Sequence, residues 1–354
     1  MDRKLKYNGA WLTDIDDTLI LSGERPSDDW ISSLSDFIKV LKEYGILWVP
    51  MSGVAIVKLG DRILNRIKPE LCSHVYYYGG DGSHKYYWDD LCNRWTDDIL
   101  FSRLFSDAQS LMILGEIEFR EALKQLKKVN SGEDFSVQER IDAAHLILKT
   151  RGYSAKECIL DRLKEKLLEN GFNPEKAETY FRGGSISWMM LGDVSADPYH
   201  EPNNLKLRTE LIRISREWLT ERGFLEDLGA TGIWVPFPGA RGIKFVLQGN
   251  NKERASRELL EWTGLKPEQI LFSGNELFEG GNDNMIRNIT GVTLLSVGEK
   301  EDPGEDVISG LINEKGVTLS GVDSNTWWMN FVITRLERGD SWNEILREMK
   351  GAIN

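Results

Sequence analysis

The chain of 354 residues is 41% hydrophobic and carries a formal net charge of −12, from 44 basic and 56 acidic side chains. Its length exceeds what one ordinary core needs and predicts two domains, or one domain with a large insertion. The negative charge argues against nucleic acid or an anionic membrane as a partner, and no apolar run approaches membrane-spanning length.

The first predicted strand runs directly into a group of acids within residues 11–20. Asp14 and Asp16 share one side of the chain if the backbone stays extended, and Asp17 begins a turn. Carboxylates this close repel each other unless a cation or a proton lies between them, which indicates a divalent metal with oxygen ligands. Asp14 could then attack phosphorus while Asp16 handles the leaving-group proton. The alternative is a capped strand-to-turn junction that happens to be rich in aspartate.

Strands and helices alternate after this cluster. An amphipathic helix is predicted from a cap at Ser27 or Asp28 to Gly45, followed by an apolar strand that ends at Ser52. A second helix (54–67) and a strand (74–78) follow. This order predicts a parallel sheet with helices on both faces, whose ligands bind at the carboxyl ends of the strands, where both Asp14 and Ser52 lie.

The pattern changes over residues 86–240, where long helical segments outnumber strands. The segments are helices at 116–128, 137–149, 155–170 and 205–222, and strands at 185–191 and 232–236. We interpret this region as an α/β domain inserted into the first, which gives a core at 1–85, an insertion at 86–240 and the rest of the core at 241–354.

The last third returns to the sheet pattern. A strand (243–247) precedes Lys252, which opens a helix to about residue 262, and the next strand (269–272) runs into a glycine-rich acidic loop that ends at Asp283. A strand at 291–297 and a helix at 325–337 complete the predicted fold.

Four short motifs occur in a fixed order, each at a strand end or a helix start. They are Asp14, Asp16 and Thr18; then Ser52; then Lys252; then the loop from Gly274 to Asp283. With them the chain, from residue 7 to about 297, resembles the haloacid-dehalogenase-like phosphohydrolase superfamily, in the branch whose C2-type cap is inserted between the second and third motifs. The resemblance implies a Rossmann-like α/β core with an inserted cap.

The resemblance also implies a role for each motif residue. Asp14 would be the nucleophile that forms an aspartyl-phosphate, and Asp16 the acid and base. Ser52 and Lys252 would bind the phosphoryl oxygens. The expected Mg²⁺ ligands are Asp14, the backbone carbonyl of Asp16, Asn275 and Asp283.

The insertion is similar to the cap of phosphomannomutases and related sugar-phosphate phosphatases. Residues 181–187 resemble their substrate-facing strand, which makes Arg182 the candidate for substrate recognition from the cap, together with Gly53 and Asn282 in the core. The alternative for Arg182 is a surface arginine at a strand end. Lys244 is the alternative to Lys252.

Two residues depart from the family pattern. Asn275 stands where the family has an aspartate that binds magnesium. An amide oxygen can still bind the ion but brings no charge, so the affinity should fall unless Glu276 or Asp283 compensates. Val54 follows Gly53 where the family usually has arginine, so an arginine contact to substrate is not expected there.

These observations predict a Mg²⁺-dependent phosphatase that acts on a small phosphate monoester, of the sugar-phosphate type. Two alternatives stay open: a sugar phosphomutase of the phosphomannomutase kind, and a binding or regulatory module that has lost its metal. Three cysteines without the spacing of a disulfide framework or a zinc site predict a reduced, cytoplasmic setting. Neither nucleic acid nor membrane is expected as a partner, and the sequence does not indicate an oligomeric state.

Overall fold

The protein is seen in a computed structural model, which divides into two compact units. Residues 1–97 and 251–354 form the first unit, and residues 98–250 form the second. The structure describes residues 7–53, 56–98, 101, 165–171, 178–182, 185–189, 210, 213–217, 220–221, 229–231, 242–246, 251–278, 281–298, 304–309 and 318–351. Within these residues, no helix combines the length and the apolar character that crossing a bilayer requires.

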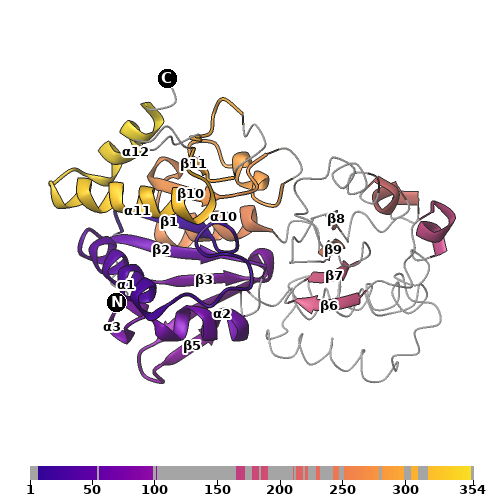
Figure 1. Ribbon diagram of the computed structural model, residues 1–354, viewed down its shortest axis with the longest axis horizontal. Coiled ribbons are helices and arrows are strands. Elements are labelled where there is room, and N and C mark those ends of the chain that lie inside the picture. Colours follow the sequence, from indigo (N-terminus) through magenta and orange to yellow (C-terminus); the bar gives the residue numbers. More distant parts are fainter. Residues whose placement is uncertain are drawn as a thin grey trace, which may run out of the picture. The chain divides into compact units, whose positions relative to one another are not determined.

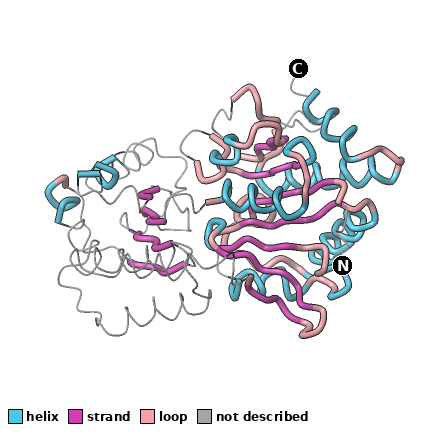
Figure 2. Tube along the Cα trace, turned by 180° about the vertical axis from the view of Figure 1, so that it is seen from behind, coloured by secondary structure: helices cyan, strands magenta, loops and turns pink. Residues whose placement is uncertain are grey.

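The first unit is built on a seven-stranded sheet in the order β11-β10-β1-β2-β3-β4-β5, seen from behind in Figure 2. Its strands are β1 (Gly9–Asp14), β2 (Ile46–Met51), β3 (Tyr76–Gly79), β4 (His84–Asp89), β5 (Arg94–Asp97), β10 (Ile270–Gly274) and β11 (Thr293–Ser296). The five strands from β11 to β3 are parallel, as the sequence predicted. The α/β fold class is therefore confirmed.

Strands β4 and β5 extend this sheet in the antiparallel direction. The chain reverses after β3 through a short 3₁₀ turn (Gly80–Gly82), in which Gly80 and Gly82 have φ of 56° and 90°. A connection this short allows only an antiparallel neighbour. β4 and β5 thus belong to the first sheet, and the two units divide after residue 97 and after residue 250.

Helices cover both faces of this sheet (Figure 1). The core on one face joins α1 (Asp28–Glu43), α11 (Gly321–Glu337) and α12 (Trp342–Gly351) to side chains such as Trp11 and Trp48. On the other face, α10 (Lys252–Thr263) buries Ala255 and Leu259. Because side chains alternate along a strand, the face opposite Trp11 receives the even-numbered residues of β1, Asp14 among them.

The connection from β2 to β3 is helical in three short pieces. These are α2 (Ile56–Arg62), a 3₁₀ turn (Leu64–Arg66) and α3 (Pro69–Cys72), where the sequence predicted one helix over 54–67. The helix predicted at 28–45 agrees closely with α1, because Ser27 accepts a hydrogen bond from the Trp30 N–H and so fixes the start.

The second unit contains a four-stranded antiparallel sheet in the order β6-β7-β9-β8. Its strands are β6 (Glu178–Arg182), β7 (Ser185–Met189), β8 (Gly229–Thr231) and β9 (Gly242–Val246). The strand predicted at 243–247 was expected in the first sheet but pairs here with β7 and β8. The strand predicted at 232–236, and most of the helices predicted between 116 and 222, lie outside the described residues.

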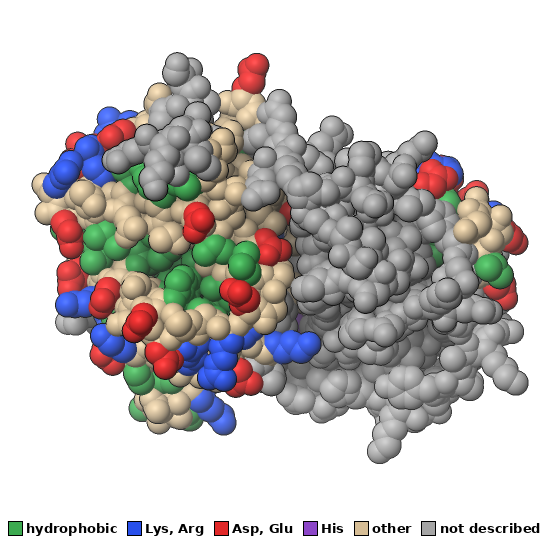
Figure 3. Space-filling view, viewed as in Figure 1, with side chains coloured by type: hydrophobic (Ala, Val, Ile, Leu, Met, Phe, Trp, Pro, Cys, Tyr) green, Lys and Arg blue, Asp and Glu red, His purple; other side chains and the backbone are tan. Residues whose placement is uncertain are grey.

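Apolar side chains reach part of the surface of the first unit, with acidic and basic side chains around them (Figure 3). In this unit, the large exposed apolar residues of the described chain include Leu21, Leu91 and Trp327. Trp327 is 41% exposed and stacks on Phe331 one turn along α11, with ring centroids 5.6 Å apart. The aromatic residues of α11 therefore extend beyond its buried side.

The partly buried His74 makes the stability of this fold depend on pH. Its ring lies edge-on against Tyr7, and burial, assisted by Lys42, lowers its pKa to about 4. Between pH 6.5 and 4 the unfolded chain binds a proton that the folded chain does not, so stability is lost as the pH falls through this window. We expect the free energy of unfolding to fall by about 1–2 kcal/mol from pH 7 to pH 5 because of His74. This contribution should be absent in His74→Gln. Urea unfolding of both proteins at the two pH values measures it, and equal losses would contradict the assignment.

Candidate active site

The predicted site residues of the core gather at the carboxyl ends of the central parallel strands. Asp14 is the last residue of β1, and in the sheet it pairs with Met51, which directly precedes Ser52. On the other side of β1, Thr13 pairs with Ser273, two residues before Asn275. The first, second and fourth motifs therefore lie together at the carboxyl ends of neighbouring strands.

A tight turn after β1 fixes the acidic cluster. The carbonyl of Ile15 accepts the N–H groups of Leu19 and Ile20 at 2.9 and 3.1 Å, and Asp17 has a positive φ of 59°. The Asp17 carboxylate accepts hydrogen bonds from the backbone and hydroxyl of Ser22, so this acid is used to close the turn. The interpretation as a capped turn thus applies to Asp17.

Lys252, the first residue of α10, joins two of the predicted acids. Its Nζ donates to Asp14 Oδ1 at 2.6 Å and to Asp283 Oδ1 at 2.5 Å, and its side chain is fully buried. The helix dipole disfavours a cation at a helix N-terminus, and burial lowers the pKa of the ammonium. The two carboxylates outweigh both effects, so the pKa of Lys252 is raised. Lys252 is therefore charged and fixed in place. Lys244, the alternative, lies in β9 of the second unit.

The loop after β10 directs Asp283 into this site. Asp283 Oδ2 accepts the Glu276 N–H at 3.1 Å, and the Glu276 carboxylate accepts the Asn282 N–H at 3.0 Å. Gly274 is required beside them, because a Cβ at that position would overlap Asp283 Oδ2. Glu276 thus holds the loop together, and Asp283 points to Lys252.

Asp14 and Asp283 supply carboxylate oxygens of the kind that Mg²⁺ binds in proteins. Asp14 and Asp283 are both buried and share the ammonium of Lys252. Burial raises the pKa of Asp14; Lys252 acts against this, and the neighbouring Asp283 carboxylate adds to it. No three histidine, cysteine or acidic side chains are grouped as a metal site within the described ranges, so amide and backbone oxygens would have to complete the shell.

Asn275 can supply such an oxygen. It follows β10 directly, and its Oδ1 accepts a hydrogen bond from the Thr18 hydroxyl at 3.3 Å. A carbonyl-type oxygen has two lone pairs, so one remains for a cation. Asn275 is thus tied to the turn that carries Asp16.

Asp16 is held by a residue that sequence reasoning missed. Its carboxylate lies 2.9 Å from Nη1 of Arg62, the last residue of α2. An arginine at the end of a short helix belongs to no motif, and its partner is 46 residues away. No signal in the sequence singles it out.

The predicted substrate residues are less closely grouped. Ser52 is buried, its N–H donates to the Tyr78 carbonyl at 3.0 Å, and Gly53 follows it half-buried. Asn282 is half-buried in the loop before Asp283. Arg182 is the last residue of β6 in the second unit, and its side chain lies outside what the structure describes.

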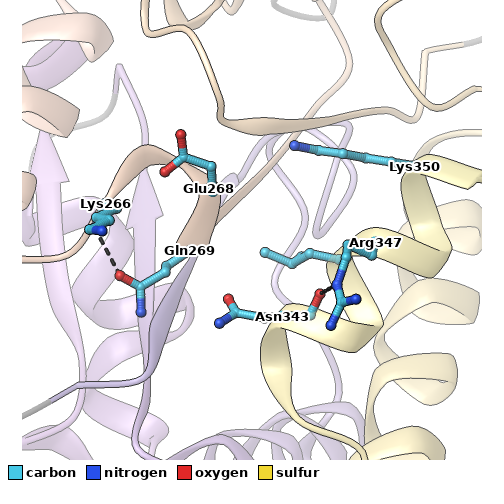
Figure 4. Close-up of a pocket in the computed structure, with 7 residues that line it drawn as sticks. Lys266, Glu268, Gln269, Asn343, Arg347 and Lys350 are labelled. Atoms are coloured by element: carbon cyan, nitrogen blue, oxygen red, sulfur yellow. Dashed lines mark hydrogen bonds between the residues drawn. The ribbon is translucent and has the colours of Figure 1, made fainter.

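A separate pocket of about 590 Å³ lies at the opposite end of β10 (Figure 4). Gln269 directly precedes β10 and lines the pocket, whereas Asn275 directly follows this strand. The other lining residues are Lys266, Glu268, Asn343, Leu346, Arg347 and Lys350. This pocket contains none of the predicted catalytic groups.

Comparison with known proteins relates this chain to solved structures only. No family model matches the sequence, and no curated protein matches it. An IMP-bound mutant of Plasmodium falciparum IMP-nucleotidase is 11% identical with a TM-score of 0.50, over 92% of this chain and 68% of that one. Against the N-terminally truncated, IMP-bound form of the same enzyme, this chain covers 64% of the other, less than two thirds of its length.

Two further similar structures have lower TM-scores. Sucrose-phosphatase from Synechocystis sp. PCC6803, in complex with sucrose and phosphate, is 14% identical with a TM-score of 0.43, over 82% of this chain and 83% of that one. A haloacid dehalogenase-like hydrolase from Bacteroides thetaiotaomicron is 16% identical with a TM-score of 0.41, over 84% of this chain and 91% of that one. At these identities the likeness concerns the fold alone.

Proposed function

Because the chain has the fold of the haloacid-dehalogenase-like hydrolases, we propose that it is a phosphatase that hydrolyses a small phosphate monoester. The observation that supports this most directly is the buried lysine between two carboxylates, Lys252 with Asp14 and Asp283, at the carboxyl end of β1. Nothing in the stability of a sheet requires this arrangement, because apolar residues of similar volume would serve the core as well. It is suited to holding a nucleophile beside an anion.

In the proposed reaction Asp14 forms a bond to phosphorus while the bond from phosphorus to the ester oxygen breaks. The departing oxygen takes that electron pair, and the protonated Asp16 gives it a proton. Asp16, now a carboxylate, takes a proton from water, whose oxygen attacks phosphorus and releases Asp14. The sum is hydrolysis of the ester to an alcohol and inorganic phosphate.

Lys252 and Ser52 would bind the phosphoryl oxygens on which negative charge gathers. Lys252 needs no reorientation to do this, since its two carboxylate bonds already fix the ammonium beside Asp14. Asp14, the backbone carbonyl of Asp16, Asn275 and Asp283 would hold Mg²⁺. The bound ion would offset the repulsion between the carboxylates and the incoming phosphate.

For the substrate we propose a sugar phosphate, with the second unit serving as a cap and Arg182 contacting the substrate. The similarity of residues 181–187 to sugar-phosphate phosphatase caps supports this choice. IMP-nucleotidase binds IMP, so nucleoside monophosphates belong among the tested compounds.

The test is phosphate release from a panel of sugar phosphates and nucleoside monophosphates, with Mg²⁺ and after its removal by EDTA. Release that requires Mg²⁺ supports the proposal, and its absence with every ester contradicts it. Conversion of mannose 1-phosphate to the 6-phosphate without phosphate release would instead indicate a mutase.

Asn275 gives a second prediction, on metal affinity. Asn275→Asp adds a negative charge in the proposed metal shell, and at an effective dielectric constant of about 20 this is worth several kcal/mol before desolvation is subtracted. We expect Mg²⁺ to bind at least about tenfold more tightly, measured by calorimetry on the purified protein. The rate need not rise, since tighter ground-state binding does not lower the barrier.

The matched control is Asn343→Asp, which adds the same charge at the opposite end of β10. Its magnesium affinity should equal that of the wild type. If Asn275→Asp behaves like this control, Asn275 is not a ligand. If neither the wild type nor Asn275→Asp binds Mg²⁺ in the presence of phosphate, the protein is the metal-free module considered above.

A further inference from the structure

Arg62 makes three bonds to the segment that carries the predicted acid and base. Its Nη1 donates to Asp16 Oδ1 at 2.9 Å, its Nε to the Glu24 carbonyl at 2.8 Å, and its Nη2 to the Leu21 carbonyl at 3.2 Å. The guanidinium therefore fixes a side chain and two backbone points of one loop at once. Its planar, forked donor geometry cannot be matched by any other side chain.

The Asp16 carboxylate depends on this contact. It lies beyond the turn that ends β1, its side chain is 28% exposed, and among the described residues no other group is bonded to its oxygens. The side chain of Arg62 is only 14% exposed, so the pair is partly shielded from water. Without Arg62, the carboxylate would be free to rotate among several rotamers.

Arg62 also connects two of the site's elements. It ends α2, the helix that begins three residues after Gly53, and its partner Asp16 follows β1. The position of Asp16 is thereby set from the end of α2, the helix that begins four residues after Ser52. The loop after β1 alone does not set it.

We propose that Arg62 is a positioning residue for Asp16. Through its bond to Asp16 Oδ1 it holds this carboxylate in one orientation at the site. This inference rests on the proposed function. Because misplacement of a reacting group by about 1 Å can cost about a hundredfold in rate, loss of this contact should lower kcat while binding is retained.

The chain offers a matched control in Arg66. Its guanidinium bonds the chain further along, at the Pro26 carbonyl (2.8 Å) and at Asp28, the first residue of α1. It also donates to the Arg62 backbone carbonyl at 3.0 Å, but it does not reach Asp16. Arg66→Met therefore removes three bonds of a neighbouring arginine, one of them to the backbone of Arg62, and leaves the bond from Arg62 Nη1 to Asp16 in place. A merely structural role would make the two arginines equivalent.

The experiment measures kcat, KM and the unfolding midpoint of Arg62→Met, Arg62→Lys and Arg66→Met with the best ester found. We expect kcat of Arg62→Met to fall about 10- to 100-fold with KM within about threefold, and Arg66→Met to keep kcat within about threefold. Arg62→Lys, which keeps the charge and protects the fold, should recover part of the loss.

A double-mutant cycle with Asp16→Asn separates positioning from general damage. If Arg62 acts through Asp16, then Arg62→Met should cause little further loss in the Asp16→Asn background. Additive losses, an unchanged kcat in Arg62→Met, or an equal loss in Arg66→Met would each overturn the inference and leave the phosphatase proposal standing. A wild type that hydrolyses no phosphate ester would overturn both.

Discussion

Replacing Asp14 with asparagine is expected to lower phosphate release by at least about a thousandfold, because an amide cannot attack phosphorus or leave as a carboxylate. The substitution is nearly isosteric, and Lys252 keeps its bond to Asp283. The fold should therefore survive. Phosphate release and circular dichroism on the same preparation measure the two effects.

Asp17→Asn is the control for this result. Asp17 is another acid of the same turn, but its carboxylate is used by Ser22, and asparagine tolerates the positive φ of this position. Its activity should stay within about tenfold of the wild type. Retention of full activity by Asp14→Asn would mean that another group is the nucleophile.

The second large effect is expected for Lys252→Met, on the free energy of unfolding. Lys252→Met leaves the buried Asp14 and Asp283 facing each other without a cation, and breaking a buried ion pair in this way costs about 3–5 kcal/mol. Urea unfolding at neutral pH measures the loss. Activity should also disappear, since the ammonium beside the nucleophile is gone.

A second substitution tests the origin of this loss. Adding Asp283→Asn to Lys252→Met removes one of the two repelling charges and should recover part of the stability. As a matched buried lysine, Lys85 lies 2.7 Å from the partly exposed Glu258, so Lys85→Met should cost less than Lys252→Met. Equal costs for the two lysines would show that the charge repulsion at Asp14 is unimportant.

Local signals predicted much of this molecule. The Ser27 cap and the apolar periodicity placed α1 almost to the residue, and a lysine before a helical pattern placed the start of α10. The ordered motifs identified Asp14, Lys252 and Asp283, and in the structure Lys252 bonds both carboxylates. Their chemical roles stay predictions.

The parts that sequence could not predict depend on partners far along the chain. A five-residue strand such as β9 carries no signal for the sheet that it joins, and it was predicted in the wrong sheet. The reversal into β4 was missed because the Tyr-rich pattern before and after residues 79–83 fits either strand direction. Arg62 was missed because its contact with Asp16 exists only after folding.

The position of β1 between β2 and β10 has a consequence for synthesis of the chain. β1 pairs with residues 46–51 on one side but with residues 270–273 on the other, so four of its ten residue pairs in the sheet await a segment made about 260 residues later. At about 5–20 residues per second, the ribosome needs roughly 13–50 seconds to deliver it. During that interval an apolar strand with an open edge is exposed to association with other chains. We expect nascent chains stalled before residue 270 to be bound by chaperones and chains released beyond β11 to escape them.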